Sequence, residues 1–389
     1  MEASLWKSRM PTTVLFFVNG FVIASWAARI PSIKASLGLG QAELGIALLL
    51  ASIGALVGLN IGGAIASRYR PRSVATVAGV AFCLALPPLA FAPDLAALAG
   101  GLFVLGLCSG FMDVSMNADA AALEKLYRRA VMSASHAFFS WGGLAGAAAG
   151  AIAAGLAATP GSEFLAVAAL GVVAVVAAGL TPNPEVPTEP PAPAFSWPSK
   201  AVLAIGLVAF CAAITEGSII DWSAIYLHGT LKTSLAVAAL GLGAYSVMMA
   251  TVRLTGDRLS SSLGAPRVVR AGFAVCMVGL VLALTVPAGA AGILGFALVG
   301  VGAATIFPLA MSAAGSAGGT SAAASIAAAA TCGYTAFLVG PVLIGVVAQA
   351  LSLRVALTFV LALLVAGFLM AGAVRGGGGV ARAPEIEVL

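Results

Sequence analysis

Three polar residues interrupt one of the apolar runs of this sequence. Asp113, Asn117 and Glu124 lie within Gly106–Glu124, at offsets that place all three on one face of a helix. A carboxylate in hydrocarbon costs about 3 kcal/mol on membrane-insertion scales, so such acids are rare and tend to line pathways. The segment therefore predicts a proton or substrate site at Asp113. The alternative is that Asp113 bonds to a neighbouring helix and only braces it.

A second pair of acids lies in another apolar run, which contains Glu216 and Asp221. Five residues turn a helix by about 140° from one position to the other, so the two acids should face different surroundings. We expect Glu216 to face a cavity, beside Gly217, which permits a local break. Asp221 is followed by Trp222, and it either lines the pathway or belongs to an interfacial belt.

Single polar residues in two further runs complete the candidate set. His136 could hydrogen-bond a solute or relay protons, or it could simply bond to a backbone carbonyl between helices. Asn19 and Trp26 are seven residues apart and share a helix face. Asn19 could form hydrogen bonds in the cavity, and Trp26 could line the cavity or only pack between helices. Arg29 should pair with an acid or extend to the interface. The predicted pathway residues are Asp113, Asn117, Glu216, His136, Asn19, Trp26 and Asp221.

The elements that must position these residues are membrane-spanning helices. The 389 residues are 61% hydrophobic and 8% charged, whereas soluble domains contain about 25% charged residues. The 47 glycines suit helices that pack closely through small residues. With about 20 residues per span, the sequence predicts twelve spans: 11–31, 42–66, 73–93, 96–120, 131–156, 163–181, 200–227, 235–254, 267–286, 289–312, 322–347 and 353–374.

A proline-rich segment, Thr181–Lys200, separates the first six spans from the last six and should be an extended linker. Two equal sets of spans suggest parallel repeats. The predicted fold is an all-α integral membrane protein with twelve transmembrane helices in two six-helix bundles. Its parts are a bundle over 1–181, a cytoplasmic linker over 182–199, a bundle over 200–374 and a disordered cytoplasmic tail over 375–389.

The distribution of basic residues predicts the orientation. With the N-terminus in the cytoplasm, 15 of the 19 Lys and Arg residues lie on the cytoplasmic side, the exceptions being Arg29, Lys34, Lys232 and Arg354. Because cytoplasmic loops carry the excess of Lys and Arg, both termini should be cytoplasmic. The even number of spans agrees with this topology.

Two loops carry a further signature. The loop after the eighth span contains Gly256, Asp257, Arg258, Gly264 and Arg267, and the loop after the second contains Gly63, Ser67, Arg68, Arg70 and Arg72. With six plus six helices and a central linker, these loops resemble the major facilitator superfamily, whose signature is roughly Gly-x-x-x-Asp-Arg-x-Gly-x-Arg. The resemblance implies a cytoplasmic gate. Its residues would be Arg68, Arg72, Asp257 and Arg258, unless the arginines only set topology.

Within that superfamily, the sequence resembles the fucose-permease-like branch and the YbjJ-like bacterial inner-membrane proteins. Asp113 and Asn117 match an acid and amide of the fourth span, and Ile306-Phe307-Pro308 looks like the tenth. His136 falls where the branch has a sugar-binding Gln. Ala27 stands where fucose permease has a first-span acid, and Glu216 could replace it. The resemblance implies a bacterial inner-membrane transporter.

Enzyme, nucleic-acid and metal functions lack sequence support. The sequence has no phosphate-binding loop, dinucleotide fingerprint or catalytic-triad spacing, and its five cysteines lie in apolar runs without metal-ligand spacing. We expect no cofactor and no nucleic-acid partner. The expected partners are a small solute, protons and the lipid bilayer, and the expected oligomeric state is a monomer. The leading hypothesis is a proton symporter of a small polar solute, which is either sugar-like or another metabolite. The alternatives are a proton-coupled drug or metabolite efflux antiporter and a non-transporting receptor or scaffold.

Overall fold

The computed structural model describes residues 2–66, 68–127, 132–181, 199–254, 256–317 and 322–375, and in these residues all the regular structure is helical. Twelve helical segments are long and apolar enough to cross a membrane, which confirms the predicted spans. The main helices are α1 (Glu2–Ser36), α2 (Gln41–Ala66), α3 (Pro71–Ala85), α4 (Leu95–Tyr127), α5 (Met132–Gly155), α6 (Pro160–Gly179), α7 (Lys200–Ile225), α8 (Leu235–Arg253), α9 (Gly256–Leu263), α10 (Ala265–Thr285), α11 (Gly289–Ala303), α12 (Ile306–Ser316), α13 (Ala322–Ala350) and α14 (Leu353–Met370).

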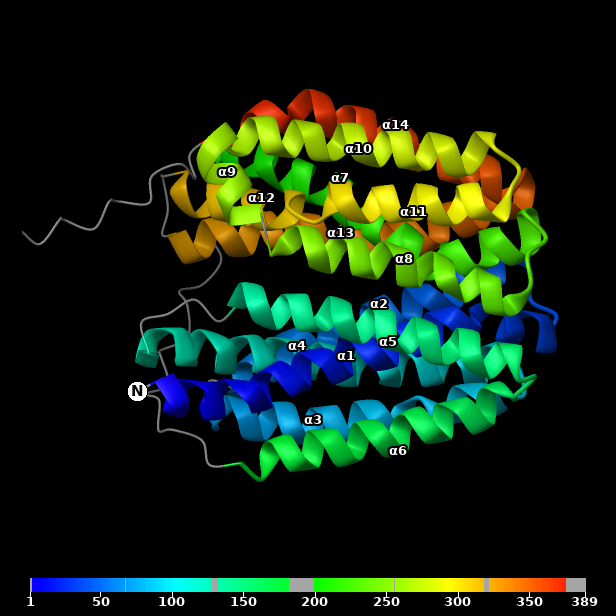
Figure 1. Ribbon diagram of the computed structural model, residues 1–389, viewed down its shortest axis with the longest axis horizontal. Coiled ribbons are helices and arrows are strands. Elements are labelled where there is room, and N and C mark those ends of the chain that lie inside the picture. Colours follow the sequence, from blue (N-terminus) through cyan, green and yellow to red (C-terminus); the bar gives the residue numbers. More distant parts are fainter. Residues whose placement is uncertain are drawn as a thin grey trace, which may run out of the picture.

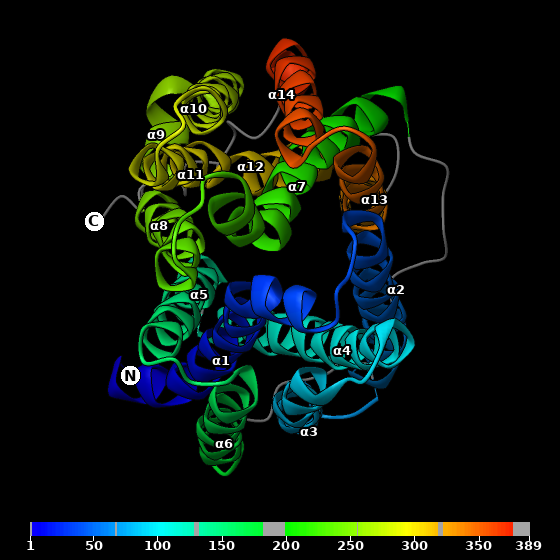
Figure 2. The same ribbon diagram turned by 90° about the vertical axis from the view of Figure 1, so that its right-hand side faces the viewer.

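The helices lie side by side along the long axis of the molecule (Figure 1). One end, here called the N-terminal end, carries the N-terminus and the α2–α3 turn, and the opposite end is called the distal end. Seen along this axis, α1–α6 form one half and α7–α14 the other (Figure 2). The halves contact each other chiefly through α5 with α8 and α2 with α13.

Glycines set the packing distance between helices within a half. A Cβ atom on Gly106 of α4 would overlap the carbonyl of Ala51 in α2, and one on Gly54 of α2 would overlap the carbonyl of Phe103. The two backbones are therefore in direct contact, as small residues allow in membrane bundles. This contact fixes the position of α4, the helix that carries Asp113 and Asn117.

Several helix boundaries differ from the predicted ones, and two of the larger differences involve proline. The first span does not end at Pro31, which lies inside α1, because one missing N–H does not have to end a membrane helix. The tenth span is broken into α11 and α12. Pro308 has no N–H to donate to the carbonyl of Ala304, four residues earlier, and Arg253 Nε donates to that oxygen at 3.4 Å. The short helix α9 was not expected.

Two predicted segments fall in parts of the chain outside the described residues. They are residues 182–198 of the expected linker and residues 376–389 of the expected tail. The proline pair of the third span, by contrast, lies within the described residues. There α3 ends at Ala85, and a 3₁₀ helix, Pro87–Phe91, completes the span.

Candidate transport cavities

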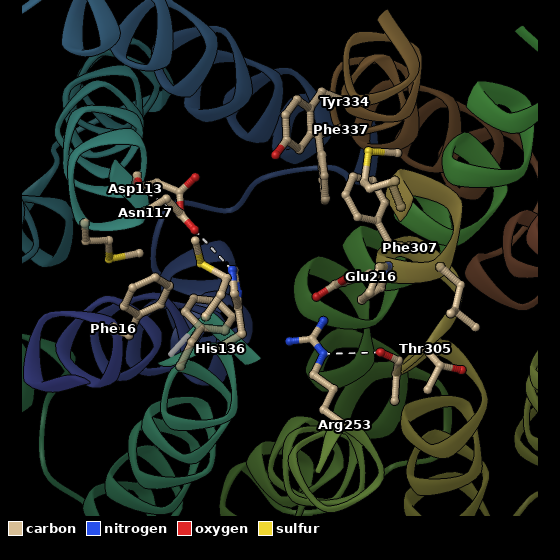
Figure 3. Close-up of a pocket in the computed structure, with 18 residues that line it drawn as sticks. Phe16, Asp113, Asn117, His136, Glu216, Arg253, Thr305, Phe307, Tyr334 and Phe337 are labelled. Atoms are coloured by element: carbon tan, nitrogen blue, oxygen red, sulfur yellow. Dashed lines mark hydrogen bonds between the residues drawn. The ribbon is translucent and has the colours of Figure 1, made fainter. Parts of the chain in front are cut away.

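A cavity of about 540 Å³, here called the central cavity, lies between the two halves and is lined by residues from both. Its polar lining includes Asp113, Asn117 and His136 from one half and Glu216 and Arg253 from the other (Figure 3). The rest of the wall is largely apolar, with five aromatic residues: Phe16, Phe139, Phe307, Tyr334 and Phe337. The volume falls within the usual range for small-molecule sites.

Asp113, Asn117 and His136 form one hydrogen-bonded chain on the wall of this cavity. Asn117 lies one turn after Asp113 on α4, and its Nδ2 donates to the Asp113 carbonyl at 2.8 Å and to Asp113 Oδ1 at 3.2 Å. This leaves Asn117 Oδ1 to accept from His136 Nε2 of α5, at 3.1 Å. The His136 ring packs against Phe16 of α1 in an edge-to-face geometry, with ring centroids 5.0 Å apart. The chain thus joins α4 to α5.

Glu216 and Arg253 lie on the opposite side of the cavity, and their side chains extend toward its interior (Figure 3). Within the described part of the chain, the Glu216 carboxylate forms no hydrogen bond and no ion pair. Arg253, the last residue of α8, donates to Ala304 O and to Ser140 Oγ, each at 3.4 Å. Because Ser140 belongs to α5, this second hydrogen bond links the two halves. The central cavity therefore contains both acidic and basic groups.

A second cavity of about 290 Å³, here called the distal cavity, extends along α1, α2, α4 and α7. Its wall includes Asn19, Trp26 and Asp221. Asp113 lines both cavities, as do the side chains of three aromatic residues: Phe139, Tyr334 and Phe337. Asp113 is thus the acid on the boundary between the two cavities.

The predicted pathway residues line two different cavities. Asp113, Asn117, His136 and Glu216 line the central cavity, and Asn19, Trp26 and Asp221 line the distal one with Asp113. Glu216 and Asp221 thus face different cavities, as their spacing on α7 predicted.

Two other polar residues of the sequence analysis lie outside the cavity linings. Glu124 Oε1 accepts from the backbone N–H of Met132 at 2.8 Å, and so it caps the start of α5. Arg29 pairs with Glu163 of α6 and donates to Ala158 O at 2.9 Å. Arg29 is therefore paired with an acid, as expected, and the pair ties α1 to α6.

The predicted gate residues are in different environments. Arg68 is exposed, whereas Arg72 is buried and forms an ion pair with Asp119 of α4. The side chains of Asp257 and Arg258 lie outside the described part of the structure. The gate role of all four stays a prediction.

Sequence reasoning missed two charged residues that form contacts between helices in the structure, Asp119 and Arg253. Asp119 follows Asp113 by six residues, a spacing that turns it to another face of α4, toward α1 and α3. Arg253 looked like a topology-setting residue in a basic loop. The signal that could have singled it out is its place at the end of an apolar span, where a long basic side chain can reach back along the helix.

At the distal end, the two halves are in direct contact. Gln41 N, at the start of α2, donates to Gln349 Oε1 of α13 at 2.7 Å. A Cβ atom on Gly45 would lie 2.5 Å from the carbonyl oxygen of Pro341 and 3.3 Å from the Cα atom of Gly345. The central cavity lies on the N-terminal side of this contact. A cavity between two six-helix halves, closed at one end, is the architecture of a secondary transporter.

Comparisons with known proteins agree with this class. The sequence profile of the Major Facilitator Superfamily matches residues 12–341. An uncharacterized MFS-type transporter of Yersinia pestis is 34% identical over 352 residues, covering 90% of this chain and 91% of that one. An uncharacterized transporter of Sinorhizobium fredii, y4wD, is 34% identical over 350 residues, covering 87% and 90%. The chain therefore belongs to the Major Facilitator Superfamily.

Solved structures share the fold at low sequence identity. A bacterial homolog of the human lysosomal transporter Spinster, in an inward-facing and occupied conformation, has a TM-score of 0.75 at 15% identity, covering 96% of each chain. The transporter FucP in the outward conformation has a TM-score of 0.63 at 14% identity, covering 94% of this chain and 98% of that one. The protein is thus a transporter, and its twelve spans and bacterial relatives make it a multi-pass inner-membrane protein.

Proposed function

We propose that this transporter moves a small polar solute, sugar-like or another metabolite, by proton symport with alternating access. The observation that carries the proposal is the position of Asp113, which lines both cavities and is hydrogen-bonded through Asn117 to His136. A proton carrier must meet solvent from each side in turn, and an acid on the boundary between two cavities is suited to this. Intramembrane acids most often serve such pathways.

The polarity of the hydrogen-bond chain supports this role for Asp113. Asn117 donates to Asp113 and accepts from His136, so the carboxylate is held as an acceptor. Only one of its oxygens receives the Asn117 side chain, which leaves the other for a proton or a solute hydroxyl. Protonation removes the cost of a charge in a low-dielectric site and favours the conformational change that carries the solute.

The contacts of the halves suggest which state the structure represents. The distal end is closed by α2 and α13, and the central cavity lies toward the N-terminal end. The basic-residue distribution predicts that the N-terminal end is cytoplasmic. With that orientation the structure corresponds to an inward-facing state, in which Asp113 would release its proton to the cytoplasm.

The test compares two acid variants in proteoliposomes, after a thermal-shift screen of sugars, nucleosides, organic acids and antibiotics has identified a solute. Asp113→Asn mimics the protonated side chain and has no proton to release. We expect this variant to bind and exchange solute but to lose uphill accumulation driven by a proton gradient. Glu216→Gln is the matched control and should keep uphill accumulation. If Glu216→Gln alone loses uphill transport, the roles are reversed, and if both variants accumulate solute, neither acid is the proton carrier.

A second candidate function, proton-coupled efflux of drugs or metabolites, is favoured by the apolar wall of the central cavity. Five aromatic side chains and three methionines, Met116, Met132 and Met311, line it. Such surfaces adapt to varied amphipathic ligands. Transport direction separates the two functions. A symporter accumulates solute in right-side-out vesicles with an inward proton gradient, whereas an efflux antiporter accumulates it in inside-out vesicles with an acidic lumen, as protons leave.

A further inference from the structure

The two cavities differ in the charges on their walls. Of the 22 residues that line the distal cavity, two are acids, Asp113 and Asp221, and none is Lys, Arg or His. The central cavity has Arg253 and His136 beside its acids. Among the described residues, the wall of the distal cavity thus carries acids without a basic side chain to balance them.

Two polar groups on the distal cavity wall lack protein partners. Among the described residues, the Asp221 carboxylate forms no hydrogen bond and no ion pair. Asn19 is 2% exposed, and its Nδ2 has no acceptor. A carboxylate without a partner is costly in an apolar setting, so a ligand that satisfies Asp221 would be bound favourably. Asp221 can accept hydrogen bonds from the ligand and balance its charge.

The remaining wall limits the size and character of that ligand. A volume of about 290 Å³ is far larger than a bare metal ion needs and suits a small organic molecule. The wall is otherwise mainly apolar and includes Trp26, Tyr334 and Phe337. Aromatic faces attract organic cations, and the attraction grows when water is excluded.

We propose that the distal cavity binds a small organic cation whose ammonium group is the counter-ion of Asp221. The aromatic side chains cover the hydrocarbon part of the same molecule. The inference rests on the proposed function in one respect, since it takes the cation to be the transported solute on its way past Asp113. Binding itself is measurable without transport.

The experiment measures binding to the purified full-length protein by thermal shift and calorimetry. The probes are ethanolamine, choline and dimethylbutanol, the neutral analogue of choline in which carbon replaces the quaternary nitrogen. We expect at least one of the two cations to raise the melting temperature and to bind at least tenfold more tightly than dimethylbutanol. Asp221→Asn should weaken cation binding at least tenfold, and Asp221→Glu, which keeps the charge, should retain it. Asp94→Asn, at an exposed acid outside both cavities, keeps an oxygen for the hydrogen bond from Ala97 N and is the matched control, which should bind as the wild type does.

Three results would overturn the proposal: neither cation binds, the neutral analogue binds as well as the cations, or Asp221→Asn binds cations as the wild type does. The comparison of charged and neutral probes uses the wild-type protein, so it holds even if a variant fails to fold. The outcome is also separate from that of the proton-coupling test. Cation binding can persist when Asp113→Asn still accumulates solute, and proton coupling can hold when the cations do not bind.

Discussion

Arg72 of α3 and Asp119 of α4 form a buried ion pair, with Arg72 Nε 3.1 Å from Asp119 Oδ2 and side-chain exposures of 2% and 4%. Thr12 of α1 donates to the same carboxylate oxygen at 2.6 Å, and Arg72 Nη2 donates to Ser8 O at 2.9 Å. The pair therefore holds three helices of one half together near the N-terminal end. Its partners lie within that half, so any effect on a gate would act through the positions of α1 and α3.

The first prediction concerns the stability contributed by this ion pair. Asp119→Asn leaves the Arg72 guanidinium buried without a counter-charge, and removing one partner of a buried pair costs about 3–5 kcal/mol. We expect a lower melting temperature of the purified protein and less protein in the membrane. Arg68→Gln, an exposed arginine four residues before Arg72, is the matched control and should leave both unchanged. Equal melting temperatures for Asp119→Asn and the wild type would contradict the prediction.

The second prediction concerns the donor that His136 provides to Asn117. His136→Leu leaves the half-buried Asn117 Oδ1 without this donor, and a hydrogen bond of this kind contributes about 0.5–1.5 kcal/mol. Since about 1.4 kcal/mol corresponds to a factor of ten, we expect the transport rate to fall by up to roughly tenfold. His136→Gln supplies an amide donor in a similar place and should retain most of the activity. Equal losses in the two variants would show that another property of the imidazole matters.

The third prediction concerns the closed distal end. Gly45→Leu places a side chain against the backbone of Pro341 and Gly345, and overpacking of this kind costs about 1–3 kcal/mol. The state that is closed at this end should therefore become less populated. Gly100→Leu is the matched control, because a Cβ atom added at Gly100 would have no heavy atom within 4 Å.

Spin labels can follow this change in a variant without native cysteines. Engineered cysteines replace Ser36 and Leu351, which are exposed at the distal end in opposite halves. We expect one short inter-label distance in the parent protein and an added longer distance with Gly45→Leu. An unchanged distance distribution would mean that the glycine contact does not hold the distal end closed.

The fourth prediction concerns orientation. The distribution of Lys and Arg predicts that the N-terminal end and the linker are cytoplasmic. A single cysteine in place of Ser196, in the linker, should react with an impermeant maleimide in inside-out vesicles and stay unlabelled in intact cells. Leu351→Cys, at the distal end, should show the opposite pattern. Labelling of the Ser196 position from outside the cell would reverse the assigned sides.

Much of the fold was predictable from the sequence because span length and apolar composition act locally. A run of about 20 apolar residues has to form a helix in hydrocarbon, whichever helices lie beside it. The positions of Asp113 and Glu216 were predictable for a related reason, since a costly acid in an apolar run usually faces a cavity. The break between α11 and α12 was less predictable. Pro308 marked the place, but the acceptor left free at Ala304 is satisfied by Arg253, a residue about fifty positions away.

The pairings between helices could not be predicted, because they depend on which faces meet. The spacing of Asp113 and Asn117 predicted a shared face of α4, yet the contact with His136 required the placement of α5 against it. Likewise, nothing local to Asp119 identified Arg72 and Thr12 as its partners. The division of the polar residues between two cavities is also a property of the packed bundle, so single-helix spacing could separate Glu216 from Asp221 but could not assign either acid to a particular cavity.

The contact of α2 with α13 at the distal end has a consequence for how the transporter responds to salt. In the described residues this contact consists of close backbone packing at Gly45 and Gly345 and a hydrogen bond from Gln41 to the Gln349 amide. Parting these particular groups exposes backbone and amide dipoles, and dissolved ions screen charges rather than neutral dipoles. Opening of the distal end should therefore be nearly insensitive to ionic strength, so that a marine or a dilute medium would leave it unchanged.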